Sequence, residues 1–361
     1  MKMRKIVCSF MISVLCFMTA ISGVSATSYD TSKINAAYSK VVEYYKNNNN
    51  LNNADKILAV ESLGLEAESN QFDTSSADLS STSLSKKIVT EVLLGVDPTE
   101  DKKTLESQID ENGNVEGSWG ASSDVWTLYA LYVTSSEKAN LIANKLNDEL
   151  AASSVCGYEW GGTYYADYDT TGWVIEGLAV VNKEKYATTI NKAIDYIKNN
   201  TTMPTTGWVT ADNVDTQSQV LEGMFAYDTH ALLNDSYTVH PVDCLLNTQL
   251  SDGSFPSGYN AEYTTAEVAK TLGTYKNGSV FEKAKKAYDK MMNPEQPDNT
   301  KPAQPTDTKK DSQSTNKVET TNQKTTSVKT GDETNVVIFV SLSMVSGGLF
   351  LVLRKEYERV H

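Results

Sequence analysis

Histidine and cysteine are scarce in this chain, which has three histidines and four cysteines among 361 residues. One of the histidines is the terminal His361, and no Ser-His-Asp constellation stands out. His230 and His240, taken with Cys156 and Cys244, lack the paired spacing of zinc ligands. The sequence therefore predicts neither a metal site nor a cofactor.

Basic residues are also in short supply, with 32 Lys and Arg against 46 Asp and Glu and a formal net charge of −14. Such an acidic body repels phosphate backbones, so nucleic acid is not an expected partner. No segment has a sustained alternation of apolar and polar residues, which excludes long half-buried strands. The fold class is therefore predicted to be all-α.

The amino terminus has the order of a secretory signal. Basic residues precede an apolar run over residues 6–21, and Val24-Ser25-Ala26 supplies a small-residue cleavage site. We expect residues 1–26 to be removed, which also removes the first two cysteines. Cys156 and Cys244 would then form the one possible disulfide or remain as two buried free thiols.

The carboxyl-terminal part is predicted to anchor the protein. Residues 336–353 are mostly apolar, carry no charge and are followed by basic residues, as in a transmembrane helix with a cytoplasmic end. Residues 294–330, rich in Pro, Thr, Asn and Lys, have almost nothing apolar to bury and are predicted to be a disordered stalk.

The segment Lys329-Thr330-Gly331-Asp332 leads into the region 331–361. Together they resemble the cell-wall sorting signal of Gram-positive surface proteins. Sortases cut that signal between Thr and Gly, which implies cleavage after Thr330. Ser327 and Val328 stand where the motif has Leu and Pro. The alternative is a simple membrane anchor. Both interpretations place residues 27–293 on the extracellular face of the membrane or in the cell wall.

Between these ends the sequence repeats itself. Residues 169–178 align with 215–224 at a spacing of 46 residues, and the register extends to Tyr263 and back to Ser122. A near-constant period of this length indicates a helical repeat array with about two helices per period. Helical patterns are predicted at 32–46, 55–65, 84–95, 124–133, 137–151, 184–199, 217–227, 265–275 and 280–292.

One repeat carries a family resemblance. Leu245, Gln249, Gly253 and Phe255 are spaced as in the glutamine-tryptophan repeat of squalene-hopene cyclases, and Leu105-Gln108 with Gly117-Trp119 is a looser version. The chain resembles the terpenoid cyclase/prenyltransferase superfamily. The resemblance implies an α/α toroid of inner and outer helices over residues 27–293. It leaves the activity open, because cobalamin carriers and other ligand-binding proteins share that fold with enzymes.

The resemblance also suggests a catalytic pair. Asp167-Tyr168-Asp169-Thr170 is similar to the Asp-x-Asp-Asp motif of those cyclases, which implies Asp169 as proton donor and Asp167 as its neighbour. Thr170 replaces the third Asp. Because Asp215-Thr216 and Tyr263-Thr264 occupy the same register, the alternative is that these residues cap helices.

Aromatic residues near the predicted helix starts suggest a binding module. The candidate ligand-binding residues are Trp126, Trp160, Tyr164, Tyr165, Tyr168, Trp173, Trp208, Asp215 and Tyr263. Aromatic faces could stack on a sugar ring, a corrin or another flat ligand, although many of these residues must belong to the core. A surface carbohydrate-active enzyme would instead use carboxylates such as Asp167, Asp169, Asp212, Asp215 and Glu262. A third alternative is an adhesion protein. We favour binding or adhesion over catalysis.

Overall fold

The computed structural model describes residues 29–68 and 80–294. The predicted signal peptide, the stalk beyond residue 294, the sorting-signal segment and the apolar span lie outside the described residues. All of the described residues belong to one compact unit. Within the two described ranges, no helix is both long enough and apolar enough to cross a membrane.

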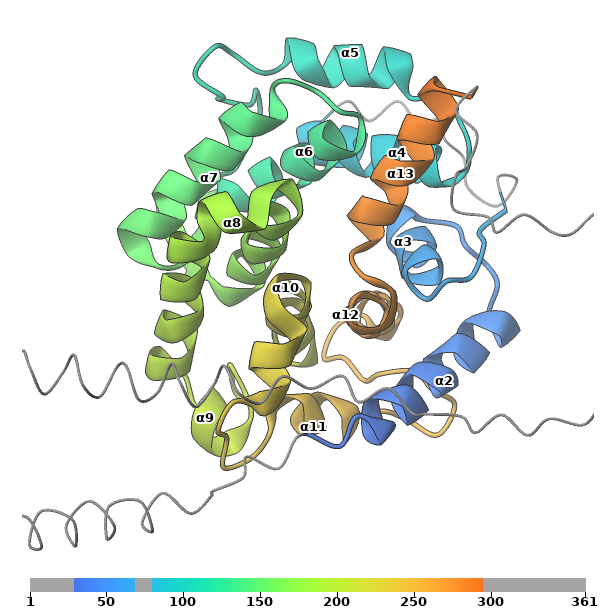
Figure 1. Ribbon diagram of the computed structural model, residues 1–361, viewed down its shortest axis with the longest axis vertical. Helices are drawn as coiled ribbons and strands as arrows, with labels where there is room; N and C mark the ends of the chain where they lie inside the picture. Colours follow the sequence, from blue (N-terminus) through green and yellow to red (C-terminus); the bar gives the residue numbers. More distant parts are fainter. Residues whose placement is uncertain (1–28, 69–79, 295–361) are drawn as a thin grey trace, which may run out of the picture. The chain divides into compact units, whose positions relative to one another are not determined.

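The described residues are mainly helical, which confirms the all-α prediction (Figure 1). The helices are α2 (Ser32–Asn47), α3 (Ala54–Ser62), α4 (Ser81–Leu93), α5 (Thr99–Ser107), α6 (Ala121–Val133), α7 (Ala139–Ser153), α8 (Tyr168–Asn200), α9 (Met203–Thr206), α10 (Val214–Asn234), α11 (Pro241–Leu246), α12 (Ala261–Asn277) and α13 (Val280–Met292). Non-helical backbone at Asn182 divides α8, and non-helical backbone at Asp228 divides α10.

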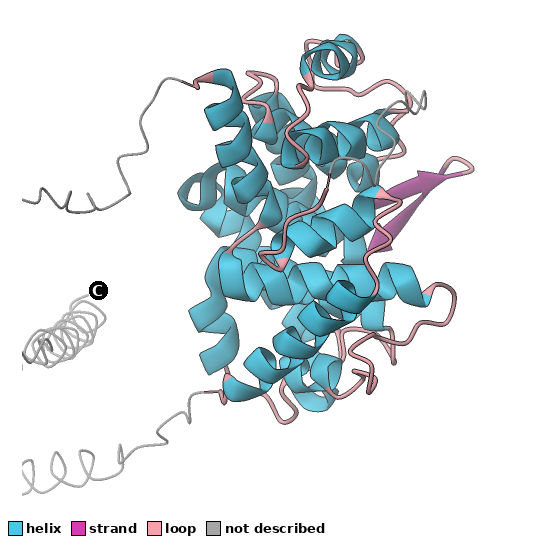
Figure 2. Ribbon diagram, turned by 90° about the vertical axis from the view of Figure 1, so that its right-hand side faces the viewer, coloured by secondary structure: helices cyan, strands magenta, loops and turns pink. Residues whose placement is uncertain are grey.

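Two short strands break the helical pattern. β1 (Cys156–Trp160) pairs antiparallel with β2 (Thr163–Asp167), and the hairpin projects from the helices in Figure 2. Gly161 and Gly162 form its turn with φ values of 57° and 77°. Two adjacent glycines provide the left-handed backbone of a tight hairpin turn. The sequence did not predict this hairpin, because each strand is too short to show sustained alternation.

The sequence pattern did not predict α5, α9 or α11. Helix α5 buries only Leu105, so it has no apolar face that would produce a readable period. Helices α9 and α11 have only 4 and 6 residues, too few to show one. The predicted helix 280–292 coincides with α13, whose apolar and polar faces are well separated. Sequence periodicity therefore identified the helices that bury a clear stripe.

Six helices contact one another in a closed order. α3 packs on α4, α4 on α6, α6 on α8, α8 on α10, α10 on α12, and α12 returns to α3. Hydrogen bonds link Tyr129 to Glu176 and Gln219 to Glu267, at separations of 47 and 48 residues. Neighbouring helices thus contact at equivalent repeat positions, so α6, α8, α10 and α12 begin at the same end.

The motif around Gln249 joins the last repeat to the first described helix. The Gln249 Nε2 atom donates to the carbonyl oxygens of Ala37 in α2 and of Gly253, at 3.0 and 3.1 Å. A Cβ at Gly253 would overlap the carbonyl oxygen of Lys40. Phe255 is fully buried. The Gln, Gly and aromatic residues of this motif therefore hold α2 against the turn that precedes α12.

Small residues allow α8 and α10 to approach closely. A Cβ at Gly223 would overlap the carbonyl oxygen of Gly172, and a Cβ at Gly172 would overlap that of Gln219. A Cβ atom cannot lie this close to a backbone oxygen. A larger residue at Gly172 or Gly223 would therefore force one of the two helices to move. This contact fixes the distance between the two helices that carry most of the site described below.

We therefore expect Gly223→Ala to destabilise the protein by about 1–3 kcal/mol, the usual cost of overpacking a filled interior. Thermal unfolding followed by circular dichroism measures the change. Gly258→Ala is the matched control, because a Cβ there meets no atom within 4 Å. Equal melting temperatures for the two variants would contradict the proposed close approach.

Candidate functional site

The four helices that begin at the same end present equivalent residues toward one another. The positions are separated by four and then three residues along each helix, which places them on one helical face. They are Ser122, Trp126 and Tyr129 in α6; Asp169, Trp173 and Glu176 in α8; Asp215, Gln219 and Glu222 in α10; and Tyr263, Glu267 and Lys270 in α12. These residues other than Ser122, together with Asp55 of α3 and Lys86 of α4, are called the inner cluster below.

The deepest charges of the inner cluster surround Lys270. This side chain is 1% exposed, and its Nζ lies 3.0 Å from Glu267 Oε2 and 3.8 Å from Glu222 Oε2. Burial opposes the charge of Lys270, but the neighbouring carboxylates raise its pKa. Burial also raises the pKa values of Glu222 and Glu176. One lysine therefore stands among three fully buried glutamates.

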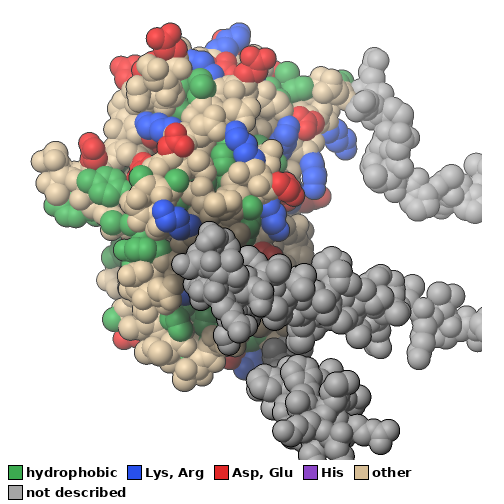
Figure 3. All heavy atoms as spheres, turned by 60° about the vertical axis from the view of Figure 1, so that its left-hand side comes forward, with side chains coloured by type: hydrophobic (Ala, Val, Ile, Leu, Met, Phe, Trp, Pro, Cys, Tyr) green, Lys and Arg blue, Asp and Glu red, His purple; other side chains and the backbone are tan. Residues whose placement is uncertain are grey.

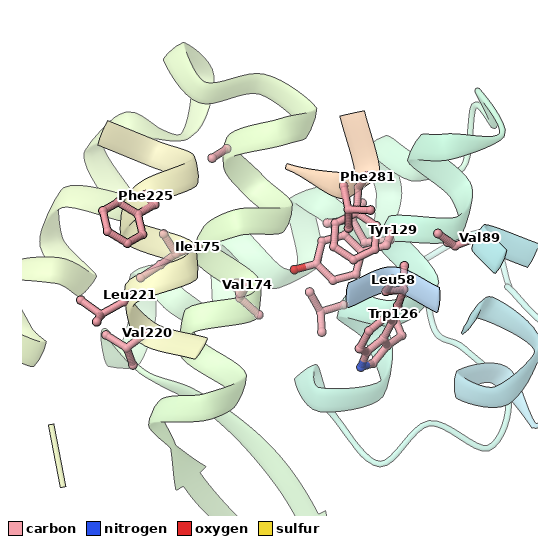
Figure 4. Packing of buried hydrophobic residues seen from close by; sticks show 14 of the residues in the cluster. Leu58, Val89, Trp126, Tyr129, Val174, Ile175, Val220, Leu221, Phe225 and Phe281 are labelled. Atoms are coloured by element: carbon pink, nitrogen blue, oxygen red, sulfur yellow. The ribbon is translucent and has the colours of Figure 1, made fainter. Parts of the chain in front are cut away.

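The first residues of α13 close the inner cluster on one side. Phe281 stacks on Tyr129 with ring centroids 3.6 Å apart, and Figure 4 shows the pair beside Trp126. Ser279 Oγ donates to Glu176 Oε1 at 2.7 Å, and Tyr129 OH donates to Glu176 Oε2 at 3.2 Å. The Glu176 carboxylate therefore accepts from two hydroxyl groups, one of which belongs to the ring that stacks on Phe281.

A second group of contacts lies one helical turn nearer the helix starts. Gln219 Nε2 donates to Glu267 Oε2 at 3.2 Å and to Tyr263 OH at 3.3 Å. On the other side, the rings of Trp126 and Trp173 meet edge to face at 5.8 Å. The Gln219 amide thus links α10 to α12, and the two indoles link α6 to α8.

Two lysines face the same indole ring. The Nζ of Lys86 lies 4.4 Å from the Trp126 ring centroid, and that of Lys270 lies 5.6 Å from it. Lys86 also pairs with Asp55 at 2.8 Å. Although burial alone would raise the pKa of Asp55, Lys86 lowers it. The Trp126 face is therefore an environment that accepts cations.

Asp169 and Asp215 lie at the starts of α8 and α10. Burial raises the pKa of Asp169 to about 7, and the charge of Asp167 adds to the shift, while Thr216 opposes it by hydrogen bonding. Burial likewise raises the pKa of Asp215, where Thr264 is the opposing partner. One carboxylate oxygen of each aspartate is shielded from solvent and has no hydrogen-bond partner among the described residues.

A pocket of about 360 Å³ opens beside Asp215. It lies between the loops that precede α10 and α12, and its lining includes Asp212, Ser257 and Tyr259. Tyr259 lies 6.1 Å from Tyr263, ring to ring. The volume is within the range of about 300–1,000 Å³ usual for small-molecule pockets. Asp215 connects this pocket to the inner cluster.

The proposed catalytic pair separates into two roles. Asp167 caps α8, because its side chain accepts from the backbone N–H of Thr170 at 2.8 Å. Asn213 and Asn260 cap α10 and α12 in the same way. Asp169 makes no such bond. The capping interpretation is confirmed for Asp167 and does not account for Asp169 or Asp215.

The aromatic candidates fall into three environments rather than one. Trp126, Trp173 and Tyr263 belong to the inner cluster. Trp160 and Tyr164 are exposed on the hairpin, at 68% and 45%. Tyr168 and Trp208 are half-buried against the apolar core. The prediction grouped residues by their distance from a helix start, and that distance does not determine which way a side chain faces.

Three further candidate residues lie outside the inner cluster. Cys156 and Cys244 are both buried and free, which corresponds to the second of the two alternatives. Burial raises the pKa of each thiol. Glu262 pairs with Lys56 at 2.8 Å. Over residues 29–68 and 80–294, no group of three or more His, Cys, Asp or Glu side chains is arranged to hold a metal ion.

Several site residues were missed by the sequence reasoning. These are Glu176, Gln219, Glu222, Glu267 and Lys270, all at most 1% exposed. A usable signal was present. The positions four and seven residues after Asp215 and after Tyr263, and seven residues after Asp169, carry polar side chains within largely apolar helices.

Comparisons of the chain with protein-family models, curated proteins and solved structures return no match.

The raised pKa of Asp169 predicts a pH-dependent stability. The folded protein keeps this proton up to about pH 7, whereas the ordinary value is 3.8. The stabilisation by the neutral carboxyl is therefore complete below about pH 4 and is lost as the pH rises through 7, by about 1.4 kcal/mol for each unit of pKa difference.

Asp169→Asn, which is neutral at every pH, should flatten this decline in melting temperature between pH 4 and 7. Asp212→Asn removes an exposed carboxylate nearby and serves as the control. An Asp169→Asn profile parallel to that of the wild type would show that this carboxyl is not the titrating group.

Proposed function

We propose that the chain is an α/α toroid of the terpenoid cyclase/prenyltransferase type that binds glycans at the cell surface. The closed order of helix contacts, the repeat period and the Gln249 motif support the fold assignment. The inner helices of the toroid would be α3, α4, α6, α8, α10 and α12. Fold alone does not select a function, so the ligand is argued from the site.

The observation that carries the proposal is the position of the exposed aromatic side chains. Within the described part of the chain they are Trp119, Trp160, Tyr164, Tyr165 and Tyr259. Every one lies in a segment that directly precedes α6, α8 or α12, the end at which the pocket beside Asp215 opens. In Figure 3 hydrophobic side chains gather on the projecting hairpin. Exposed apolar surface concentrated in this way marks an interaction site.

A saccharide matches this combination of groups. Aromatic rings provide flat apolar faces for the C–H faces of sugar rings, while Asp215 and Ser257 offer hydrogen-bonding partners within the pocket. Trp119 and the hairpin lie together, because Glu159 N–H donates to the Trp119 carbonyl oxygen at 2.6 Å. A whole corrinoid, with the side chains of its ring, is larger than a pocket of about 360 Å³, so we favour the glycan over the corrinoid.

A second candidate function is acid-base catalysis on the same ligand. It is favoured by Asp169, whose pKa of about 7 would allow it to give or take a proton at neutral pH. Asp215 would be the second carboxylate. Release of reducing ends from a bound oligosaccharide would distinguish a surface carbohydrate-active enzyme from a binding module. The cyclase-like proton donor would be the same Asp169.

The location of the protein is also a proposal. We infer from the order of signal, stalk, Thr330-Gly331 and apolar span that the domain stands outside the cell, attached to the membrane or to the cell wall. A stalk of this composition would hold the binding surface away from the membrane.

For glycan binding, we expect an oligosaccharide identified on a glycan array to bind the purified full chain at least about tenfold more weakly when Trp160 and Tyr259 are both replaced by alanine. That loss corresponds to about 1.4 kcal/mol of stacking. Isothermal titration calorimetry measures it. The control is Met292→Ala, which removes an exposed apolar side chain at the end of α13. Unchanged affinity in the double variant would contradict the aromatic surface.

For anchoring, we expect the wild-type protein in the peptidoglycan fraction of a Gram-positive host and Thr330→Ala in the membrane fraction. The reason is that sortase requires the Thr-Gly bond, whereas the apolar span would retain uncut protein. Immunoblots of fractionated cells measure this. If both proteins stay in the membrane, the simple anchor is correct.

A further inference from the structure

Among the buried polar atoms of the inner cluster that lack a hydrogen-bond partner, acceptors outnumber donors. Six of its buried side-chain atoms have no hydrogen-bond partner among the described residues: Asp169 Oδ1, Asp215 Oδ1, Gln219 Oε1, Glu222 Oε2, Glu267 Oε1 and Trp173 Nε1. Five of these are oxygens, and one is an N–H donor. Buried polar atoms in native proteins are normally paired, so a partner rich in donors would satisfy these five oxygens.

Acidic side chains also outnumber basic ones in the inner cluster. Of the two lysines in the cluster, Lys86 is committed to Asp55 at 2.8 Å. Lys270 is shared between Glu267 and Glu222. Both lysines also face Trp126, so their ammonium groups already occupy its ring. Asp169, Asp215 and Glu176 have no lysine within ion-pairing distance in the described structure.

In the free protein, protons compensate part of this excess. Burial raises the pKa values of Asp169, Asp215, Glu176 and Glu222, so these groups hold protons above their ordinary range. A bound cation would displace those protons, and the buried carboxylates would then be charged and paired with the cation.

The neutral amide of Gln219 supports the same conclusion. The side chain is 1% exposed, and its Nε2 donates to Glu267 and Tyr263. Its Oε1 therefore lies within the cluster as an unused neutral acceptor. A metal ion is a poor occupant, because the described carboxylates do not form a ligand group. An ammonium group, with three donors, matches Oε1 and the adjacent carboxylates.

We propose that the glycan carries a free primary amine, and that its ammonium group passes the pocket beside Asp215 and binds between Asp215, Gln219 and Glu267. This inference rests on the proposed glycan-binding function and names its substrate class as amino sugars that are not N-acetylated. Because the amine of an amino sugar is bonded directly to its ring, the amine-bearing ring lies against Asp215, and the adjoining sugar unit lies in the pocket near Tyr259.

The test compares a fully de-N-acetylated glucosamine oligosaccharide with its N-acetylated counterpart of the same length, by calorimetry on the purified full chain. We expect the free-amine form to bind at least about tenfold more tightly. Asp215→Asn and Gln219→Met should each remove most of this preference. Gln219 does not line the pocket, so Gln219→Met should leave the N-acetylated form bound within about twofold. Asp212→Asn is the matched control, since Asp212 lines the same pocket but is exposed, and it should keep the preference.

The outcomes separate the two proposals. Equal binding of both oligosaccharides would overturn the amine inference and leave glycan binding intact. Failure of both to bind, in a protein with a normal melting temperature, would overturn glycan binding by these sugars and the inference with it. Putrescine is the third ligand: if it binds as tightly as the free-amine oligosaccharide, the sugar contributes nothing and the amino-sugar proposal is wrong.

Discussion

The burial of Lys270 is the constraint on which the packing of α10 and α12 depends. Its ammonium group has lost its water, and the carboxylates of Glu267 and Glu222 replace that water from α12 and α10. An unpaired charge at this depth would cost several kcal/mol, so the two helices must keep the register that brings these residues together. Gln219 tightens the same register by donating to Glu267.

Close backbone contacts make this polar interior possible. Gly172 and Gly223 bring α8 against α10, and Gly273 does the same for α12 against α3, where a Cβ would overlap Ser62. Because the helices approach so closely, side chains from opposite members of the circuit meet, as when Lys270 of α12 faces the Trp126 ring of α6. The Gln249 contact with α2 completes the packing from the outside.

Stability alone does not explain the buried polar groups of the inner cluster. Carboxylates with raised pKa values and acceptors without partners weaken a fold, and proteins retain such groups mainly at functional sites. Here they lie beneath the end that displays the exposed aromatic side chains. The pocket beneath the exposed aromatic side chains and the acidic interior share Asp215, which is why one ligand is proposed for both.

By itself the sequence determined the helical class, the repeat period and most helix positions, since these follow from short-range periodicity that Ile34, Ala37 and Val41 illustrate. The sequence also indicated Asp169 and Asp215 as candidate site residues. It could not separate Asp167, a cap, from Asp169, a buried acid, because both stand at the same helix start. Only the tertiary structure decided that Glu222 and Lys270 are internal, because the groups that bury and pair a charge come from other helices, distant in the chain.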